Sequence, residues 1–365
     1  MDKKRKKILF IIPNLGGGGS ERVLVTLLAN IDRVKFEPIL LVVKKEGRYK
    51  DDIAKDIKVI DLNASQLRYA IFKIVKSIKS IKPDIVYSTL GHLNLVIAMI
   101  RPFFSKQIAF VARESNTVSS HNQQERYPKL FDWLFRKVYN NLDLIINQSK
   151  YMKNDLIENY YIDENKIKVI YNPVDFKKIE ESIDADNKIL FDKDKINLLC
   201  VGKLAYEKGY DILIEAVAKL DDNFFITILG EGGEEESLKK LAKERGVSQK
   251  INFIGFVQNP YSYMSQADML LLPSRYEGLP NVILEAQACG KPAITFDAPG
   301  GMREIIEDGF NGFLVTPFNT DEFAQKIQKA SNHDFNSIDI KEDCRKKYSV
   351  KKIIREYEDI LEKVN

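Results

Sequence analysis

The chain has 365 residues, of which 44% are apolar and 30% are charged, and its formal net charge is +4. Single hydrophobic cores stop growing at about 250 to 300 residues, so this length predicts two domains. The composition is typical of a folded globular protein and excludes a disordered chain.

From the sequence we expect neither secretion nor membrane spanning. The apolar run after the basic N-terminus is interrupted by Pro13 and four glycines, and no stretch reaches the roughly 18 apolar residues that a spanning helix needs. Cys200, Cys289 and Cys344 are widely spaced, without a C-x-x-C pair or a metal-like cluster with the three histidines. We therefore expect a cytoplasmic protein with reduced thiols.

Charge is divided unevenly along the chain. Residues 1–175 contain 30 Lys and Arg against 19 Asp and Glu, a balance of +11, whereas the remainder has 26 against 33, a balance of −7. A basic first half suits an anionic surface such as phospholipid, or an acceptor that bears a pyrophosphate. We expect no nucleic-acid partner.

Short apolar runs alternate with helical patterns, which is the rhythm of a doubly wound α/β domain with a parallel sheet. The predicted strands of the first domain are 8–12, 39–43, 59–62, 85–87, 108–111 and 144–146. A charge-rich stretch, 177–195, is interpreted as a linker whose aspartates are solvated rather than metal ligands. Strands are predicted again at 198–201, 225–229, 251–254, 269–272 and 293–295.

A Gly-rich turn follows the first predicted strand and precedes a helix with an apolar face. Glycine lets a ligand approach the backbone, and the N–H groups at a helix N-terminus suit a pyrophosphate. We therefore predict that Gly18 and Gly19 contact a diphosphate. The match to G-x-G-x-x-G is loose, because Ser20 or Glu21 stands where the last glycine belongs, so a flexible turn is the alternative.

Two lysines follow the first strand of the second domain. Lys203 comes at the end of the strand, beside Gly202, and Lys208 comes at the start of the next helix. Ligands of open α/β sheets bind at the carboxyl ends of strands, so this pair predicts a phosphate site, with solvated surface lysines as the alternative. Gly230 begins a glycine turn after a later predicted strand, and Phe256 follows a glycine at the end of the next, where a flat base could lie against the backbone. The alternative is that these strand-end glycines are simple connections.

The strongest motif is a pair of glutamates, Glu277 and Glu285, between a predicted strand and a helix. Pro280 suits the first turn of that helix and Gly290 lies past its end, so both carboxylates are expected to face one cleft. Carboxylates accept hydrogen bonds from sugar hydroxyls, and we predict that Glu277 holds a hexose and Glu285 a ribose. The alternative is one exposed and one capping glutamate. The amides expected to face an anion are those of Gly278, Leu279, Asn281 and Val282.

Together these motifs resemble those of the retaining glycosyltransferases of family four, which build bacterial lipopolysaccharide, capsule and lipid-linked oligosaccharides. The shared motifs are Gly18-Gly-Ser-Glu-Arg22, Asn172-Pro-Val-Asp175, Val201-Gly-Lys203, Lys208-Gly209, the glutamate pair, Ala298-Pro-Gly-Gly301 and Asp308-Gly-Phe-Asn-Gly312. The resemblance implies a glycosyltransferase-B fold of two facing Rossmann-like domains. It assigns 1–178 to the acceptor side, 179–349 to the donor side, and 350–365 to a helix that crosses back to the first domain.

The resemblance also assigns roles to residues. It places Lys203 and Lys208 on the donor diphosphate. An arginine is usual at the position of Lys203, and a lysine keeps the positive charge but cannot form the bidentate hydrogen bonds of an arginine. A histidine usual on the acceptor side is absent. The candidates for acceptor contacts are His92, Arg113, Glu114, Ser115 and Asn116.

The implied reaction is retaining transfer of a hexose or N-acetylhexosamine from a nucleotide sugar, with UDP favoured, to a growing glycan or lipid-linked acceptor. The departing diphosphate would take the acceptor's proton, while Lys203, Lys208 and the glycine amides stabilise its charge and Glu277 orients the sugar. No Asp-x-Asp motif stands in a plausible site, so we expect no metal and no cofactor. The alternatives are a sugar-nucleotide epimerase, a GDP-mannose-dependent mannosyltransferase, a nicotinamide-dependent dehydrogenase and a non-catalytic interaction protein.

Two segments, 67–82 and 127–139, mix basic and apolar residues at helical spacing. They predict a peripheral contact with the inner face of the cell membrane, and simple packing on the sheet is the alternative.

Overall fold

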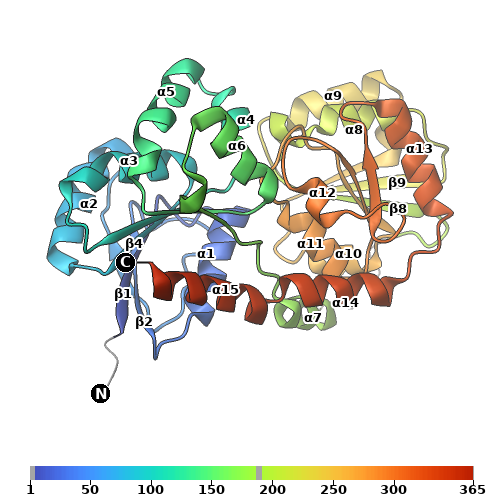
Figure 1. Cartoon of the computed structure of the whole chain (residues 1–365). Coiled ribbons are helices and arrows are strands. Elements are labelled where there is room, and N and C mark those ends of the chain that lie inside the picture. Colours follow the sequence, from blue (N-terminus) through green and yellow to red (C-terminus); the bar gives the residue numbers. More distant parts are fainter. Residues whose placement is uncertain (1–4, 186–190, 365) are drawn as a thin grey trace. The chain divides into compact units, whose positions relative to one another are not determined.

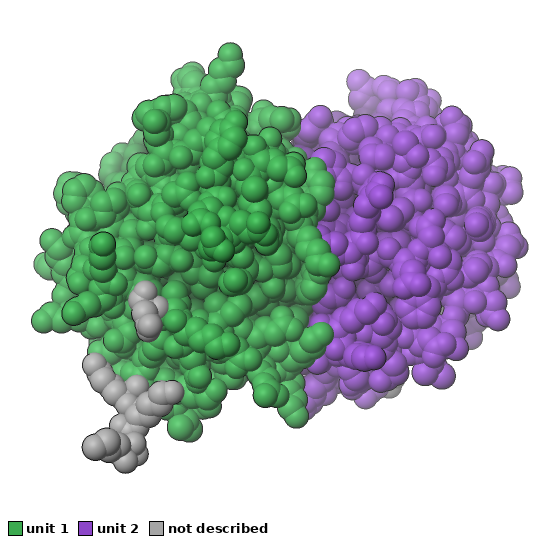
Figure 2. Space-filling model, viewed as in Figure 1, with its two compact units in different colours: residues 1–173, 350–365 green, residues 174–349 purple. Residues whose placement is uncertain are grey.

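The computed structural model describes residues 5–185 and 191–364. The chain divides into unit 1, Met1–Pro173 with Val350–Asn365, and unit 2, Val174–Ser349 (Figure 2). The boundary therefore falls before residue 178. The first part of the expected linker is helical instead. Helix α7 (Phe176–Asp184) packs on α10 (Tyr261–Gln266) and α11 (Asn281–Ala288) and so belongs to unit 2. Of the linker aspartates, Asp186 lies outside the described residues.

Unit 1 is built on a seven-stranded parallel sheet in the order β3-β2-β1-β4-β5-β6-β7 (Figure 1). Its strands are β1 Lys6–Ile12, β2 Phe36–Val42, β3 Lys58–Asp61, β4 Ile85–Thr89, β5 Ala109–Arg113, β6 Leu144–Asn147 and β7 Ile167–Val169. Each predicted strand of this domain overlaps one of these. Because the order reverses between β1 and β4, the connections after these two strands open a crevice at the carboxyl edge.

Helices cover both faces of this sheet. Its helices are α1 Gly19–Asn30, α2 Leu67–Ile81, α3 Gly91–Ile100, α4 Val118–Asn122, α5 Pro128–Val138, α6 Lys150–Tyr160 and α15 Val350–Lys363. Apolar side chains of α1 and α15 pack on one face, and those of α2, α3, α5 and α6 pack on the other. The sheet is therefore buried on both sides, which explains why its strands are continuous apolar runs.

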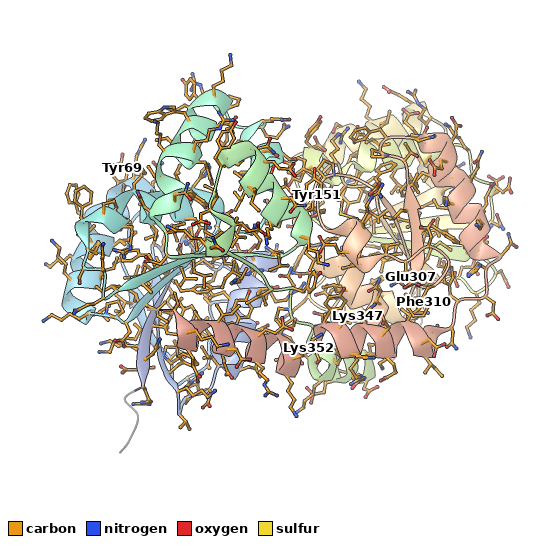
Figure 3. The ribbon with its side chains drawn as sticks, in the orientation of Figure 1. Tyr69, Tyr151, Glu307, Phe310, Lys347 and Lys352 are labelled. Atoms are coloured by element: carbon orange, nitrogen blue, oxygen red, sulfur yellow. The ribbon has the colours of Figure 1, made fainter. Side chains whose placement is uncertain are left out.

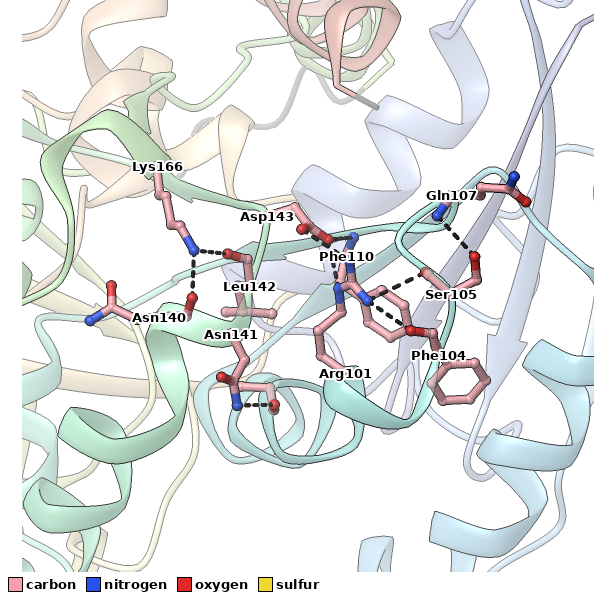
Figure 4. A network of polar contacts seen from close by, with 11 residues as sticks. Arg101, Phe104, Ser105, Gln107, Phe110, Asn140, Asn141, Leu142, Asp143 and Lys166 are labelled. Carbon is pink, nitrogen blue, oxygen red and sulfur yellow. Dashed lines mark hydrogen bonds and ion pairs between the residues drawn. The ribbon is translucent and has the colours of Figure 1, made fainter.

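Charged side chains fix the opposite, amino-terminal edge of the same sheet (Figure 4). Arg101 Nε donates to Asp143 Oδ2 at 2.8 Å, and the Phe110 amide donates to the same oxygen at 2.8 Å. Lys166 Nζ donates to the carbonyl oxygen of Leu142 at 3.0 Å. These contacts hold connections at the edge away from the crevice.

Unit 2 repeats this design with a six-stranded parallel sheet in the order β10-β9-β8-β11-β12-β13. Its strands are β8 Ile196–Val201, β9 Phe224–Leu229, β10 Ile251–Gly255, β11 Met269–Leu272, β12 Ala293–Phe296 and β13 Gly312–Val315. Its other helices are α8 Tyr210–Val217, α9 Glu235–Glu244, α12 Met302–Ile305, α13 Thr320–Ser331 and α14 Ser337–Tyr348. Here the order reverses between β8 and β11. The predicted pair of doubly wound domains is confirmed.

The first and last residues of unit 2, Val174 and Ser349, lie side by side. Val174 and Ser349 form a parallel bridge, and the Val174 amide donates to the Tyr348 carbonyl oxygen at 2.8 Å. Helix α15 then buries Ile353 and Tyr357 in the core of unit 1. The predicted return of the last helix to the first domain is confirmed.

The three cysteines are free thiols, and burial raises the pKa of each, to about 12 for Cys289. Within the described residues, none of the helices combines the length and apolar character needed to cross a bilayer.

Candidate active site

The connections that follow β8 and β11 lie side by side at the carboxyl edge of the unit 2 sheet, because these strands are neighbours where the order reverses. The first connection contains a 3-10 turn, Tyr206–Lys208, and the second contains Glu277. This topology brings together Lys208 and Glu277, which lie 69 positions apart in the sequence.

Lys208 and Glu277 form a close, largely buried ion pair. Lys208 Nζ lies 2.6 Å from Glu277 Oε1, and Ser274 Oγ donates to the same oxygen at 2.7 Å. The two side chains are only 21% and 12% exposed. Hydrogen bonds between ionised groups are stronger than neutral ones and fix geometry, so the ammonium and the carboxylate are pre-positioned at the edge where ligands of such sheets bind.

Arg275 clamps the two connections to each other. Its guanidinium donates to both carboxylate oxygens of Asp211, at 2.9 and 2.6 Å, and to the Tyr206 carbonyl oxygen at 2.7 Å. It also lies 4.1 Å from the centre of the Tyr206 ring, and its amide donates to the Glu207 carbonyl oxygen at 2.8 Å. A bidentate arginine of this kind holds the 3-10 turn, and so Lys208, beside Glu277.

Glycines let the surrounding backbones approach. Gly230 has a φ of +152°, and a Cβ there would lie 1.8 Å from the Gly202 carbonyl oxygen. Gly300 has a φ of +139°, and a Cβ there would lie 2.6 Å from the Glu277 carbonyl oxygen. The Glu277 amide donates to the Pro299 carbonyl oxygen at 2.9 Å, so residues 298–301 support the loop that carries the carboxylate.

Unit 1 has a pocket of about 260 Å³ at its own crevice between β1 and β4. Leu90, which begins the connection after β4, adopts a φ of +80°, a strained value for a bulky residue and one that clusters at functional sites. The pocket is lined by Pro13, Leu90, Gly91, His92, Leu93, Glu114, Ser115, Asn116, Val118, His121, Asn122 and Phe135. Four of the five acceptor-side candidates are therefore brought together.

Glu114 is the buried carboxyl of this pocket. It accepts a hydrogen bond from Asn94 Nδ2 at 2.7 Å and another from the Tyr139 hydroxyl. Burial raises the pKa of Glu114, although these hydrogen bonds oppose the shift. A carboxyl with a raised pKa in a pocket is suited to binding or deprotonating a hydroxyl.

Comparison with known proteins now identifies the family. The model described as Glycosyltransferase Family 4 matches residues 17–178, and that described as Glycosyl transferases group 1 matches residues 181–348. The chain is also 30% identical over 338 residues to N-acetylgalactosamine-N,N'-diacetylbacillosaminyl-diphospho-undecaprenol 4-alpha-N-acetylgalactosaminyltransferase of Campylobacter jejuni, covering 90% of this chain and 91% of that protein. The chain is a family-four glycosyltransferase.

Other relatives agree with this assignment. A second Campylobacter jejuni protein, GalNAc-alpha-(1->4)-GalNAc-alpha-(1->3)-diNAcBac-PP-undecaprenol alpha-1,4-N-acetyl-D-galactosaminyltransferase, is 26% identical and covers 90% of this chain and 89% of its own length. The structure of the Anabaena protein HepE in complex with UDP and glucose matches with a TM-score of 0.83 at 22% identity, covering 98% and 100% of the two chains. The expected glycosyltransferase-B fold is confirmed.

Arg113 of the glycosyltransferase does not line the unit 1 pocket. Its Nε donates to the Tyr357 hydroxyl at 3.1 Å, and its Nη2 donates to Asn172 Oδ1 at 2.7 Å. Arg113 is the last residue of β5 and points to the face that α15 covers, whereas Glu114 begins the connection after the strand and reaches the pocket. Arg113 thus joins the last helix to the sheet, and its predicted acceptor contact is corrected.

The Gly-rich turn of the glycosyltransferase lies in unit 1, where Gly18 and Gly19 are exposed at the start of α1. The Glu21 carboxylate accepts hydrogen bonds from the backbone of Gly18 and Glu21, and burial raises its pKa. The sequence predicted that the N–H groups at this helix N-terminus bind a diphosphate. In the structure, the Glu21 carboxylate accepts hydrogen bonds from some of these groups.

The remaining donor-side candidates lie at the expected edge of unit 2. Lys203 is exposed beyond the end of β8, and Phe256 is 45% exposed just after Gly255. Glu285 lies on α11 and is only 7% exposed. The other candidate contacts surround the start of that helix, with Gly278 and Leu279 buried and Asn281 and Val282 half-buried.

Two features of the glycosyltransferase were missed by the sequence analysis. The first is the clamp between Arg275 and Asp211, whose members lie 64 positions apart. The second is the approach of His92, His121 and Glu125, which form a cluster where the sequence suggested none. The only available signal for the second was that His92 and His121 follow two apolar runs predicted to be consecutive strands.

Proposed function

We propose that this glycosyltransferase moves a hexose or N-acetylhexosamine, with retention, from a UDP-sugar to a growing glycan on a lipid diphosphate carrier. The observation that carries the proposal is the Lys208–Glu277 pair, whose Nζ and Oε1 lie 2.6 Å apart at the carboxyl edge of unit 2. Two Campylobacter relatives named as N-acetylgalactosaminyltransferases act on undecaprenol-linked diphosphates, and HepE was solved with UDP, which supports the donor and acceptor classes.

In the proposed reaction the bond between the anomeric carbon and the diphosphate oxygen breaks, and a bond to the acceptor oxygen forms on the same face of the sugar. The acceptor hydroxyl proton passes to the departing diphosphate oxygen. Lys208, assisted by Lys203, stabilises the growing negative charge, and Glu277 orients the sugar. Because these side chains supply the positive charge, we propose that transfer requires no metal ion.

The unit 1 pocket is proposed to bind the acceptor. Glu114 and Asn116 present polar groups to it, and its other lining residues include the apolar Leu90 and Phe135. Pockets of this mixed character hold small ligands by apolar contact and orient them by a few polar groups.

The function is tested first by thermal shift with UDP, GDP and ADP and their sugars, followed by transfer to lipid diphosphate acceptors. UDP should raise the melting temperature more than GDP does, and NMR of the product should show the anomeric configuration of the donor. A GDP preference, an inverted product, or loss of turnover in a chelator would contradict the corresponding part of the proposal. Conversion of the donor without any acceptor would favour an epimerase.

Substitutions of Glu277 and Glu285 are predicted to change different kinetic constants. Glu277→Ala should lower kcat about 100-fold, since it removes a group that positions the reacting sugar. Glu285→Ala should chiefly raise the donor Kd, by about 10-fold to 100-fold, the value of a hydrogen bond to a charged group. Steady-state kinetics and calorimetric donor binding separate the two.

A matched control for this pair is Glu215→Ala, which removes a surface carboxylate that pairs with Arg245 in the same unit. It should change neither constant by more than about twofold, because exposed ion pairs contribute little. Equal and negligible effects of all three substitutions would refute the donor site.

We also propose that unit 1 contacts an anionic membrane through α2 and α5. Phe72 on α2 is 88% exposed, Trp133 on α5 is 53% exposed, and Tyr69 of α2 lies at the surface in Figure 3. Both helices cover the same face of the sheet, and Lys76 and Lys79 are exposed on α2. An amphipathic surface with aromatic and basic residues is suited to the lipid interface.

Because Trp133 is the chain's single tryptophan, its fluorescence reports this contact directly. We expect a blue shift with vesicles containing phosphatidylglycerol, reversed by salt and absent with phosphatidylcholine alone. The double substitution Lys76→Glu and Lys79→Glu should weaken binding about 30-fold or more, from about 1 kcal/mol for each lysine. The same change at Lys239 and Lys240, exposed on α9 of unit 2, is the control. Equal binding by both variants would contradict the proposed surface.

A further inference from the structure

We propose that His92, His121 and Glu125 form a binding site for a divalent transition-metal ion, with Zn²⁺ preferred, beside the unit 1 pocket. An imidazole nitrogen of each histidine and a carboxylate oxygen of Glu125 all lie within 4.8 Å of one another. The chain has three histidines, and two of them meet here. This site is separate from the lysines and glutamates proposed to act on the donor.

The topology of the sheet brings these ligands together. His92 lies in the first turn of α3, directly after β4, whereas His121 and Glu125 follow β5. Strands β4 and β5 are neighbours and parallel, so the segments that follow them emerge at the same edge. Glu125 lies just past the end of α4, and its carboxylate comes within 3.5 Å of His121 Nε2.

The distances suit a tetrahedral ion. Glu125 Oε1 lies 3.0 Å from His92 Nε2 and 3.5 Å from His121 Nε2. Zinc–nitrogen bonds of about 2.0 to 2.1 Å place neighbouring ligand atoms of a tetrahedron about 3.3 Å apart. The two imidazole–carboxylate distances lie on either side of that value, so an ion fits after small side-chain rotations.

The ligand types decide the class of ion. Two imidazoles with one carboxylate favour Zn²⁺ and its neighbours, such as Co²⁺ and Ni²⁺, whereas Mg²⁺ and Ca²⁺ require oxygen ligands. Three protein ligands leave a fourth position for a water molecule or a ligand oxygen. His92 and His121 both line the pocket, but transfer is proposed to require no metal ion, so the ion is assigned no part in the reaction itself.

The segments that carry the ligands are anchored independently of any ion. The Ser119 amide donates to Asp155 Oδ2 at 3.1 Å, and Asn122 Nδ2 donates to Asp132 Oδ1 at 2.9 Å, which fixes α4. The His92 ring packs on Phe131, with ring centres 5.1 Å apart. A site that is already arranged loses less conformational freedom when the ion binds.

The test uses full-length protein from which any histidine tag has been removed. Competition with a chromophoric chelator should show one Zn²⁺ bound per chain, and Co²⁺ should give the visible absorption of a four- or five-coordinate site. His92→Ala and His121→Ala should each weaken Zn²⁺ binding at least about 10-fold, the loss found even when an outer-shell partner of a ligand is removed. Glu125→Gln, which keeps the shape of the side chain, should weaken it as well.

His333→Ala is the matched control, because His333 is exposed in unit 2, where its ring nitrogen bonds to the Gly309 carbonyl oxygen. Its Zn²⁺ affinity should equal that of the unaltered protein, and circular dichroism should show that all four variants fold. Zn²⁺ binding that is as tight in the His92 and His121 variants as in the unaltered protein, or absent from the unaltered protein, would overturn the proposal and leave a plain histidine–carboxylate contact. The readout does not depend on glycosyl transfer.

Discussion

Replacing Lys208 by alanine is expected to lower kcat about 100-fold to 1000-fold. Its ammonium group lies at the carboxyl edge of the unit 2 sheet, 2.6 Å from Glu277 and 21% exposed. In the proposed reaction negative charge grows on the departing diphosphate, and removal of one pre-positioned donor to such a charge commonly has an effect of this size. Turnover at saturating donor is the measurement, because it separates the chemical step from weaker binding.

Two comparisons make this result specific. Lys219→Ala removes another lysine of unit 2 that forms an ion pair, with the exposed Asp321, and it should leave kcat within about twofold. The double substitution Lys208→Ala with Glu277→Ala should be little worse than the more damaging single one, since residues that act as a unit have non-additive effects. A kcat within about threefold of the unaltered enzyme for Lys208→Ala would refute the assigned role.

Strands were predictable from the sequence where burial is complete. Strand β1, for example, has five consecutive fully buried apolar residues, Ile8 to Ile12, and this leaves no other plausible assignment. By contrast, β7 has three residues and β13 four, each at the edge of its sheet, so neither makes a long apolar run. Helix α7 was interpreted as a linker because its surface is charged and only Phe176 and Ile179 are buried.

The candidate site was predictable to the extent that sheet topology determines it. Strand-end positions follow from the βαβ rhythm, so Lys208 and Glu277 were each placed at the ends of strands, although their direct contact was not predicted. The direction in which each side chain points at a strand end was not predictable from the sequence. Arg113 and Glu114 are adjacent in the sequence, yet one joins α15 and the other reaches the pocket, because the last residue of β5 is where the strand alternation ends. Likewise, the clamp between Arg275 and Asp211 depends on how two connections fold over each other.

Gly230→Ala is expected to destabilise unit 2 by about 4 kcal/mol or more, in the range reserved for a specific structural conflict. A Cβ at this position would lie 1.8 Å from the Gly202 carbonyl oxygen, a backbone atom, and the two residues lie just past the ends of neighbouring strands. The Gly230 amide also donates to the Gly255 carbonyl oxygen at 2.8 Å, so the segment is held between the ends of β8 and β10. Relief would require these strand ends to separate, which would displace Gly202 and the connection that carries Lys208.

Gly246→Ala separates this clash from the general difficulty of placing alanine at a positive φ. Gly246 has a φ of +71°, and a Cβ there would meet nothing within 4 Å. We expect it to cost about 1 to 2 kcal/mol, the penalty for an L-residue in the left-handed region. Calorimetry of both variants is the measurement. At about 2 to 4 °C per kcal/mol for a domain of this size, Gly230→Ala should lower the melting temperature of unit 2 by roughly 10 °C and Gly246→Ala by a few degrees. Equal losses would show that the strand ends yield freely, and the backbone around Lys208 would then not be the rigid support that the proposed catalysis requires.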